Sequence, residues 1–213
     1  MGFGRGRVDD ERRNGLVLVR HGETPWSRSG QHTGRTDLEL TELGRRQAEL
    51  IGARLRGRPL ALVLTSPLRR ARETARLAGF PDAEPSDDLM EWDYGAYEGL
   101  TTAQIRAQAP GWALWRDGVP GGETIEQVSR RVERVVARVR DADGDALLFA
   151  HGHVLRVLTA RWLGLPARDG RLFKLDSATL SVLGYEHDWP AVALWNDRSH
   201  LEAPPSRASP AAV

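Results

Sequence analysis

The chain has 213 residues, of which 40% are hydrophobic and 28% are charged, which excludes a collagen-like, largely disordered or membrane-spanning protein. Its 30 basic and 29 acidic residues leave a formal net charge of +1, which argues against a nucleic-acid partner. Because the chain has no cysteine, disulfides, thiol catalysis and cysteine-ligated metal centres are excluded as well.

The two ends of the chain differ in composition from the rest. Residues 1–13 are rich in glycine and arginine, and residues 202–213 are rich in proline, alanine and serine, so we expect a disordered arm and a disordered tail around a single domain at 14–201. No segment has the apolar core of a signal peptide, and no apolar run approaches the ~18 residues of a membrane helix. These features predict a cytoplasmic protein with no membrane partner.

Three short apolar runs predict buried strands, at residues 16–19, 60–64 and 146–150. Thr41 is a plausible N-cap for a helix that ends before Gly57, and Ser66 is expected to cap another with Pro67 at its first position. Further helices are expected over 101–108, 124–140 and 154–163, and two or three antiparallel edge strands before Trp195. Strands that alternate with helices predict a three-layer α/β/α sandwich with a mostly parallel sheet.

Polar residues follow each of the three predicted strands. They are Arg20 and His21, then Ser66 with Arg69 and Arg70, and finally His151. In open sheets of this kind a ligand lies beyond the carboxyl ends of the strands, where these side chains would converge. Because an unpaired guanidinium is costly to bury, the cluster predicts an anion pocket for phosphate, sulfate or carboxylate. Lys174 is the only lysine, so arginine or histidine would have to supply the cations.

Four motifs resemble those of the histidine phosphatase superfamily, whose best-known members are the phosphoglycerate mutases. They are Arg-His-Gly-Glu-Thr at 20–24, Ser-Pro-Leu-Arg-Arg-Ala at 66–71, Leu-Met-Glu at 89–91 with Gly95 and Glu98-Gly99, and Phe-Ala-His-Gly at 149–152 with Arg156. The first motif alone would be a weak signal, but all four occur here in the family's order.

This resemblance implies a phosphohistidine mechanism that needs no metal ion or other cofactor. The catalytic residues that it implies are Arg20, His21, Arg70, Glu91 and His151. His21 would attack phosphorus, and Glu91 would protonate the leaving oxygen and then accept a proton from water. The other three would surround the phosphoryl oxygens. Arg70 is preferred to Arg69 because the family's arginine directly precedes the alanine.

Five further residues are expected to contact the substrate: Ser27, Thr33, Gly34, Glu123 and His153. Thr33 and Gly34 could instead be turn residues, and Glu123 could simply favour the start of a helix. A metal clamp made by His151 and His153 lacks the third ligand that such a site needs. The remaining histidines, His32, His187 and His200, are expected on the surface or in packing roles.

The segment between Leu100 and Gly122 favours hydrolysis over transfer. It holds only two cations, Arg106 and Arg116, whereas the mutases carry a longer, more basic insert there. The surrounding sequence is similar to mycobacterial acid phosphatases and to fungal sedoheptulose-1,7-bisphosphatases within the family. Arg35, Arg106 or Arg116 could bind a distal phosphate or lie in solvent, and Trp112 and Trp115 could form a lid or pack in the core.

The sequence therefore predicts a phosphatase that takes small phosphomonoesters such as sugar phosphates and releases inorganic phosphate. Two alternatives remain open within the family, a cofactor-dependent phosphoglycerate mutase and a sugar bisphosphatase. A non-catalytic phosphate-binding module is the third, from a different class of protein. A homodimer through an edge strand is expected only by analogy with other proteins of this fold.

Overall fold

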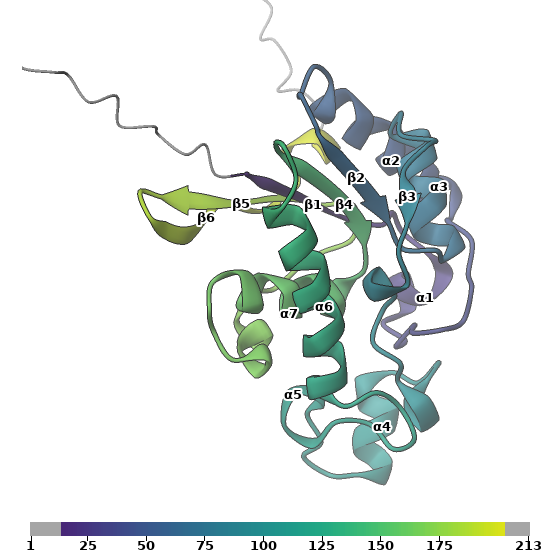
Figure 1. Cartoon of the computed structure of the whole chain (residues 1–213). Helices are drawn as coiled ribbons and strands as arrows, with labels where there is room; N and C mark the ends of the chain where they lie inside the picture. The colour runs from purple at the N-terminus through teal and green to yellow at the C-terminus, as the bar shows by residue number, and fades with distance from the viewer. Residues whose placement is uncertain (1–13, 203–213) are drawn as a thin grey trace, which may run out of the picture.

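The computed structural model describes residues 14–202, and its centre is a six-stranded sheet in the order β3-β2-β4-β1-β5-β6 (Figure 1). The strands are β1 Leu16–Arg20, β2 Leu62–Thr65, β3 Glu84–Pro85, β4 Ala146–Ala150, β5 Leu180–Glu186 and β6 Trp189–Asp197. The first four in sequence pair in parallel, and β5 and β6 add an antiparallel edge. The predicted arm at 1–13 and the tail from residue 203 onward lie outside the described residues.

Seven helices accompany the sheet in residues 14–202. They are α1 Pro25–Ser29, α2 Glu42–Leu55, α3 Arg69–Leu77, α4 Thr102–Gln108, α5 Leu114–Asp117, α6 Ile125–Arg140 and α7 Gly152–Trp162. Thr41 caps α2 as predicted, because its side chain accepts a hydrogen bond from the backbone N–H of Gly44 at 3.0 Å. Within this range no helix combines the length and the apolar character needed to cross a bilayer.

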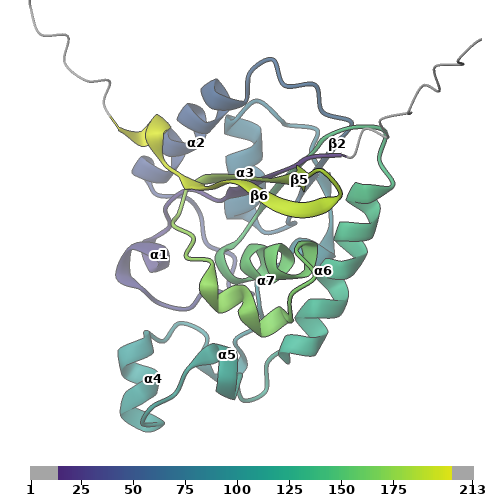
Figure 2. The same ribbon diagram turned by 90° about the vertical axis from the view of Figure 1, so that its left-hand side faces the viewer.

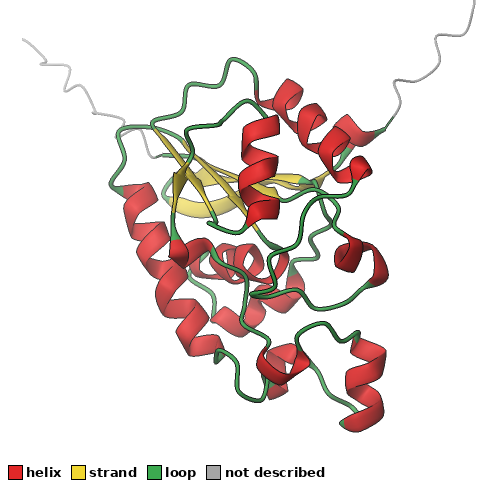
Figure 3. Ribbon diagram, turned by 90° about the vertical axis from the view of Figure 1, so that its right-hand side faces the viewer, coloured by secondary structure: helices red, strands yellow, loops and turns green. Residues whose placement is uncertain are grey.

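The layers follow from alternation along the buried strands. Leu16 and Leu18 of β1 belong to a core shared with α6 and α7, whereas Val17 and Val19 face a second core shared with α2 and α3. Both faces of the central strands are therefore covered, which explains why their sequences are continuous apolar runs. Figure 3 shows helices on both sides of the sheet, so the predicted three-layer arrangement with a mostly parallel sheet is confirmed.

Two predicted boundaries are wrong at the second strand and the helix after it. β2 begins at Leu62 rather than Leu60, and α3 begins at Arg69 with Leu68 at its N-cap. Ser66 does not cap that helix because its hydroxyl contacts the ring of His151 at 2.7 Å. The same hydroxyl accepts a hydrogen bond from the N–H of Leu68, so the chain turns before the helix starts.

Helices α4 and α5 belong to a small lobe formed by residues 94–122. Figures 1 and 2 place both helices at the end of the molecule away from the β5–β6 hairpin. The lobe closes on itself at its base, where the indole N–H of Trp92 donates to the carbonyl of Glu123 at 2.8 Å. The backbone N–H of Asp93 donates to the Glu123 carboxylate at 3.0 Å in the same place.

Candidate active site

The two histidines at the strand ends lie side by side, as the sequence predicts. β1 and β4 are neighbours in parallel register, with Arg20 opposite Ala150, so His21 and His151 follow at the same edge of the sheet. Their ring centroids are 5.1 Å apart, and both side chains are buried.

His21 is held as a neutral ring with one free nitrogen. Its Nδ1 lies 2.8 Å from the carbonyl oxygen of Gly22, which can only accept, so Nδ1 carries the proton and Nε2 keeps its lone pair. Burial, followed by the charges of Arg70 and Arg20, holds the pKa of His21 well below its ordinary value of 6.5. Gly22 is required there because a Cβ would come within 2.4 Å of the Gly44 carbonyl oxygen on α2.

Arg20 presents an unsatisfied donor beside this ring. Its Nη1 donates to the carbonyl of Leu175 at 2.5 Å, but its buried Nε has no hydrogen-bond partner among the described residues. Burial lowers the pKa of Arg20 below its ordinary value, although the group remains charged at any physiological pH. A buried, unpaired guanidinium N–H next to a neutral imidazole is the arrangement expected of an anion site.

Arg70 is buried behind these residues, on α3. Its Nε donates to His151 Nδ1 at 3.1 Å, and its two terminal nitrogens donate to the carbonyls of Thr36 and Gly34, both at 2.9 Å. Since His151 accepts on Nδ1, its proton lies on Nε2, facing the hydroxyl of Ser66. Arg69 instead is exposed and pairs with Glu39, so the structure brings Arg70 and not Arg69 to the cluster.

The Glu91 carboxylate is fixed at the N-terminus of α7. One oxygen accepts from the backbone N–H groups of Trp92 and Val154, at 2.9 and 2.8 Å, and the other from that of His153 at 2.9 Å. Three backbone N–H donors therefore hold both oxygens of this side chain in place. Arg131 braces the chain just before it by donating to the carbonyls of Asp88 and Met90.

These groups border a cavity of about 280 Å³. It is lined by Arg20, His21, Ser27, Gly30, Gln31, His32, Thr33, Glu91, Tyr94, Thr102, Gly152, His153, Arg156 and Leu175. Arg70 and His151 lie immediately behind this lining rather than in it. Ser27, Thr33 and His153 line the cavity as predicted, so the structure unites most of the predicted set.

Gly34 and Glu123 do not line the cavity, although both are predicted to contact the substrate. The N–H of Gly34 donates to Glu98 at 2.9 Å, while its carbonyl accepts from Arg70. Glu123 forms an ion pair with the buried Arg131 at 2.9 Å. The carbonyl of Gly34 instead positions Arg70, and the ion pair of Glu123 fixes the base of the lobe.

Two of the cavity-lining residues that are absent from the predicted set carry polar rings, His32 and Tyr94. His32 is predicted to be a surface or packing residue, but it is half-buried and faces the cavity. The Tyr94 hydroxyl forms a hydrogen bond of 2.5 Å with Nδ1 of His153. Burial, more than the charge of Glu91, raises the pKa of Tyr94 well above its ordinary value of 10.0. The one sequence signal for His32 is its position directly before Thr33.

The structure shows the contacts of the arginines and tryptophans whose roles the sequence leaves open. Arg35 lies 3.7 Å from the carboxylate of Asp93, and Arg106 donates to the carbonyl of Trp112 at 2.9 Å. Arg116 pairs with Asp117 at 2.8 Å. Trp112 is buried in the core, and the ring of Trp115 is covered by the Arg156 guanidinium, 4.7 Å from its centroid.

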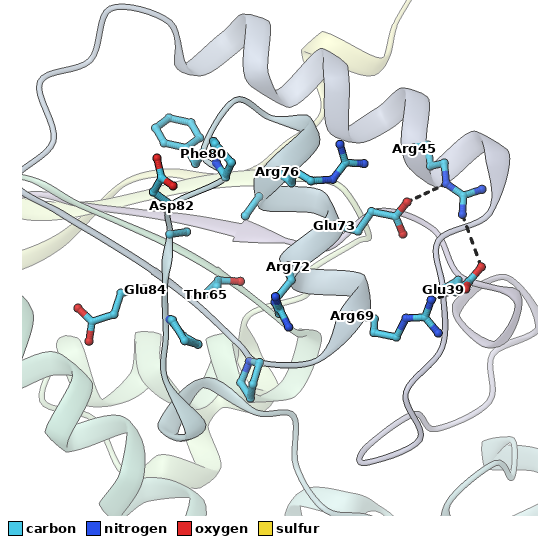
Figure 4. Close-up of a pocket in the computed structure, with 15 residues that line it drawn as sticks. Glu39, Arg45, Thr65, Arg69, Arg72, Glu73, Arg76, Phe80, Asp82 and Glu84 are labelled. Atoms are coloured by element: carbon cyan, nitrogen blue, oxygen red, sulfur yellow. Dashed lines mark hydrogen bonds and ion pairs between the residues drawn. The ribbon is translucent and has the colours of Figure 1, made fainter.

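A larger cavity of about 1010 Å³ lies on the outer face of α3 (Figure 4). Its lining has four arginines and four acidic residues but no histidine. Figure 4 shows Arg45 between Glu73 and Glu39, with nitrogen to oxygen distances of 2.8 and 3.6 Å. Because these charges largely neutralise one another and the lining has no histidine, this cavity lacks the features of the candidate site at His21. In residues 14–202 no cluster of three or more histidine or acidic side chains could hold a metal ion.

The buried histidines make stability depend on pH. Burial lowers the pKa values of His21, His151 and His153 well below 6.5, so the unfolded chain takes up more protons than the folded protein below that pH. We expect the free energy of unfolding to fall as the pH drops from about 7 to 5, by up to ~1.4 kcal/mol per pH unit for each histidine. Denaturant titrations across this range test this, and a flat unfolding free energy would contradict it.

Comparison with known proteins agrees with the motifs. Residues 16–198 match the model of the histidine phosphatase superfamily (branch 1). The chain is 45% identical to an acid phosphatase of Mycobacterium tuberculosis, covering 83% of this chain and 89% of the relative. It is 38% identical to sedoheptulose 1,7-bisphosphatase of Saccharomyces cerevisiae, covering 84% of this chain and 91% of that relative.

A solved structure of an open reading frame product from M. tuberculosis aligns with a TM-score of 0.83 and 43% identity, over 87% of this chain and 98% of that one. The resemblance predicted from the motifs is confirmed.

Proposed function

The chain belongs to the histidine phosphatase superfamily, and we propose that it hydrolyses small phosphomonoesters through a phosphohistidine on His21, without a metal ion. The observation that carries the proposal is the free Nε2 lone pair of the neutral His21 ring in a cavity that Arg20 also lines, with the buried Nε of Arg20 lacking a hydrogen-bond partner among the described residues. A nucleophile needs its lone pair and a phosphoryl group needs cations, and these two residues supply both.

In the first step Nε2 of His21 attacks phosphorus, and the bond between phosphorus and the ester oxygen breaks. The departing oxygen takes a proton from Glu91 and leaves as an alcohol. Arg20 stabilises the negative charge that is spread over the phosphoryl oxygens, and Arg70 adds a second positive charge from behind. His151 contributes the N–H on its Nε2. When phosphate binds, this N–H donates to a phosphoryl oxygen instead of to the Ser66 hydroxyl.

In the second step a water molecule attacks the phosphohistidine and gives its proton to Glu91. The bond between phosphorus and nitrogen breaks, inorganic phosphate leaves, and neutral His21 is regenerated. Glu91 must therefore be protonated before the first step.

Phosphate release in the presence of a chelator tests the proposal directly. We expect the purified chain to hydrolyse p-nitrophenyl phosphate at full rate with excess EDTA, because His21 and the arginines replace a metal ion. Rapid acid or base quenching during turnover of a ³²P-labelled substrate should trap a phosphoenzyme that survives base and is lost in acid, as expected of a phosphoramidate bond.

Two results would refute the proposal. Activity that is lost in EDTA and restored by a divalent cation would assign the chemistry to a metal ion. Transfer of phosphate between positions of phosphoglycerate without net release of inorganic phosphate would assign the chain to the mutases.

A further inference from the structure

The part of the cavity beyond the nucleophile is lined by uncharged polar side chains. Ser27, Thr33 and Thr102 line it, together with His32 and Tyr94. Such a surface makes hydrogen bonds to a leaving group but supplies no charge to it. The proposed chemistry fixes where phosphate lies, so this wall must face the alcohol.

The charges around the cavity match one phosphate and leave no surplus. Arg20, Arg70 and Arg156 contribute three positive charges. Glu98, which accepts hydrogen bonds from Gly34 and Thr36 beside Arg70, contributes one negative charge, and Glu91 is neutral when it acts as the proposed acid. The two remaining positive charges are neutralised by a single phosphate, which carries ≈ −1.5 to −2 at neutral pH.

Arg156 also lines the cavity, and most of its guanidinium is already engaged. Its Nε donates to the carbonyl of Gly170 at 3.0 Å, and its Nη2 to that of Arg171 at 3.1 Å. The guanidinium also stacks on the Trp115 ring. These contacts fix it against the 3-10 helix at Ala167–Leu172, so two of its three nitrogens already have partners.

His32 offers an acceptor in the same wall. Its Nδ1 lies 2.8 Å from the carbonyl oxygen of Leu100, which fixes the proton of the neutral ring on Nδ1 and leaves Nε2 with a lone pair. Within the part of the chain that the structure describes, Nε2 makes no hydrogen bond. The ring is held edge-on by Tyr94 and Trp112, at centroid distances of 5.0 and 5.6 Å. A lone pair at this position attracts a hydroxyl group and repels a carboxylate or phosphate oxygen.

From the charge balance and the His32 acceptor, we infer that the preferred substrates are monophosphates of neutral polyhydroxy alcohols, from glycerol to a simple sugar in size. A substrate hydroxyl donates to Nε2 of His32, which makes His32 a specificity-determining residue. This inference rests on the proposed phosphatase function. It disfavours substrates with a second anionic group, such as phosphoglycerates and sugar bisphosphates.

A matched pair of substrates tests the charge preference. Glycerol 3-phosphate and 3-phosphoglycerate share a carbon chain and differ in a hydroxymethyl group against a carboxylate. We expect kcat/KM to be at least ~10-fold higher for glycerol 3-phosphate, because the carboxylate leaves its charge unpaired near an acceptor. The same direction is expected for fructose 6-phosphate over fructose 1,6-bisphosphate. Equal or reversed preferences would overturn the inference.

A His32→Asn variant tests the residue itself. Asparagine can still donate to the Leu100 carbonyl but lacks an acceptor where Nε2 stood. Losing one hydrogen bond predicts a fall of about 2- to 10-fold in kcat/KM for glycerol 3-phosphate. The loss on p-nitrophenyl phosphate, whose leaving group has no hydroxyl, should be several-fold smaller. His187→Asn, a matched change at an exposed position, should alter neither value.

The outcomes separate the two proposals. Equal losses on both substrates would show that His32 only supports the fold of the wall, which overturns its assigned role. Hydrolysis of p-nitrophenyl phosphate together with a preference for 3-phosphoglycerate would overturn the inference and leave the phosphatase function standing. No hydrolysis of any of these esters by the parent chain would overturn both.

Discussion

A His21→Ala protein is expected to release phosphate at least ~10⁴-fold more slowly than the parent chain and to form no phosphoenzyme. The loss is this large because the variant has no nucleophile, and water would have to attack an ester that Arg20 and Arg70 merely hold. Steady-state phosphate release and quench-flow trapping of the phosphoenzyme measure the two effects separately. Retention of the parent rate would show that the imidazole does not attack phosphorus.

Folding and phosphate binding supply the internal checks for this variant. The arginines remain in place, so calorimetry should still detect inorganic phosphate binding to the His21→Ala protein. Removing one of three buried histidines whose pKa is lowered should also make its unfolding free energy less sensitive to acid. His187→Ala, at a side chain that is 88% exposed, is the matched control and should leave all of these properties unchanged.

A Glu91→Gln protein is expected to lose about 10²- to 10⁴-fold in kcat on an alkyl phosphate and much less on p-nitrophenyl phosphate. An alkoxide leaves only with a proton, which glutamine cannot give, whereas nitrophenolate leaves without one. Initial rates on both esters, measured for the parent chain and the variant, give the two losses side by side.

The hydrogen bonds of Glu91 determine which control measurement the Glu91→Gln variant needs. Both of its oxygens accept from backbone N–H groups, so a glutamine amide must point its own donors at one of them. An unpaired buried donor costs about 1–3 kcal/mol, so thermal unfolding has to be measured beside the rates. Glu126→Gln, in the exposed first turn of α6, is the matched substitution. Equal losses on alkyl and aryl esters would contradict the role of Glu91 as the acid.

Much of the fold is predictable from sequence because the central strands are buried on both faces. Continuous apolar runs such as residues 146–150 therefore indicate buried strands. Threonine N-caps mark the starts of the long helices. The start of α3 was not predictable in the same way. Ser66 has the residue type of an N-cap, but its hydroxyl contacts a histidine 85 positions away, and local rules contain no information about that contact.

In the candidate site, too, strand-end residues are predictable from sequence and loop residues are not. Strand ends bring Arg20, His21 and His151 together through register alone, so sequence reasoning can find them. The cavity wall opposite is built from loop residues such as His32, whose neighbours depend on how the lobe packs. Glu123 is the reverse case, since a motif resemblance suggests a substrate contact and the structure shows an ion pair with Arg131 outside the cavity lining.

The closure of the lobe at Trp92, Asp93 and Glu123 has a consequence for how such a chain can change over time. The two ends of residues 94–122 are joined by hydrogen bonds to each other, while the acid before them is anchored to α6 and α7. Tyr94 and Glu98 at the start of the lobe contact His153 and Gly34, so they are expected to tolerate little change. Insertions farther along the lobe, between α4 and α5, are expected to leave the proposed catalytic residues in place and to change only the part of the cavity wall that faces the alcohol.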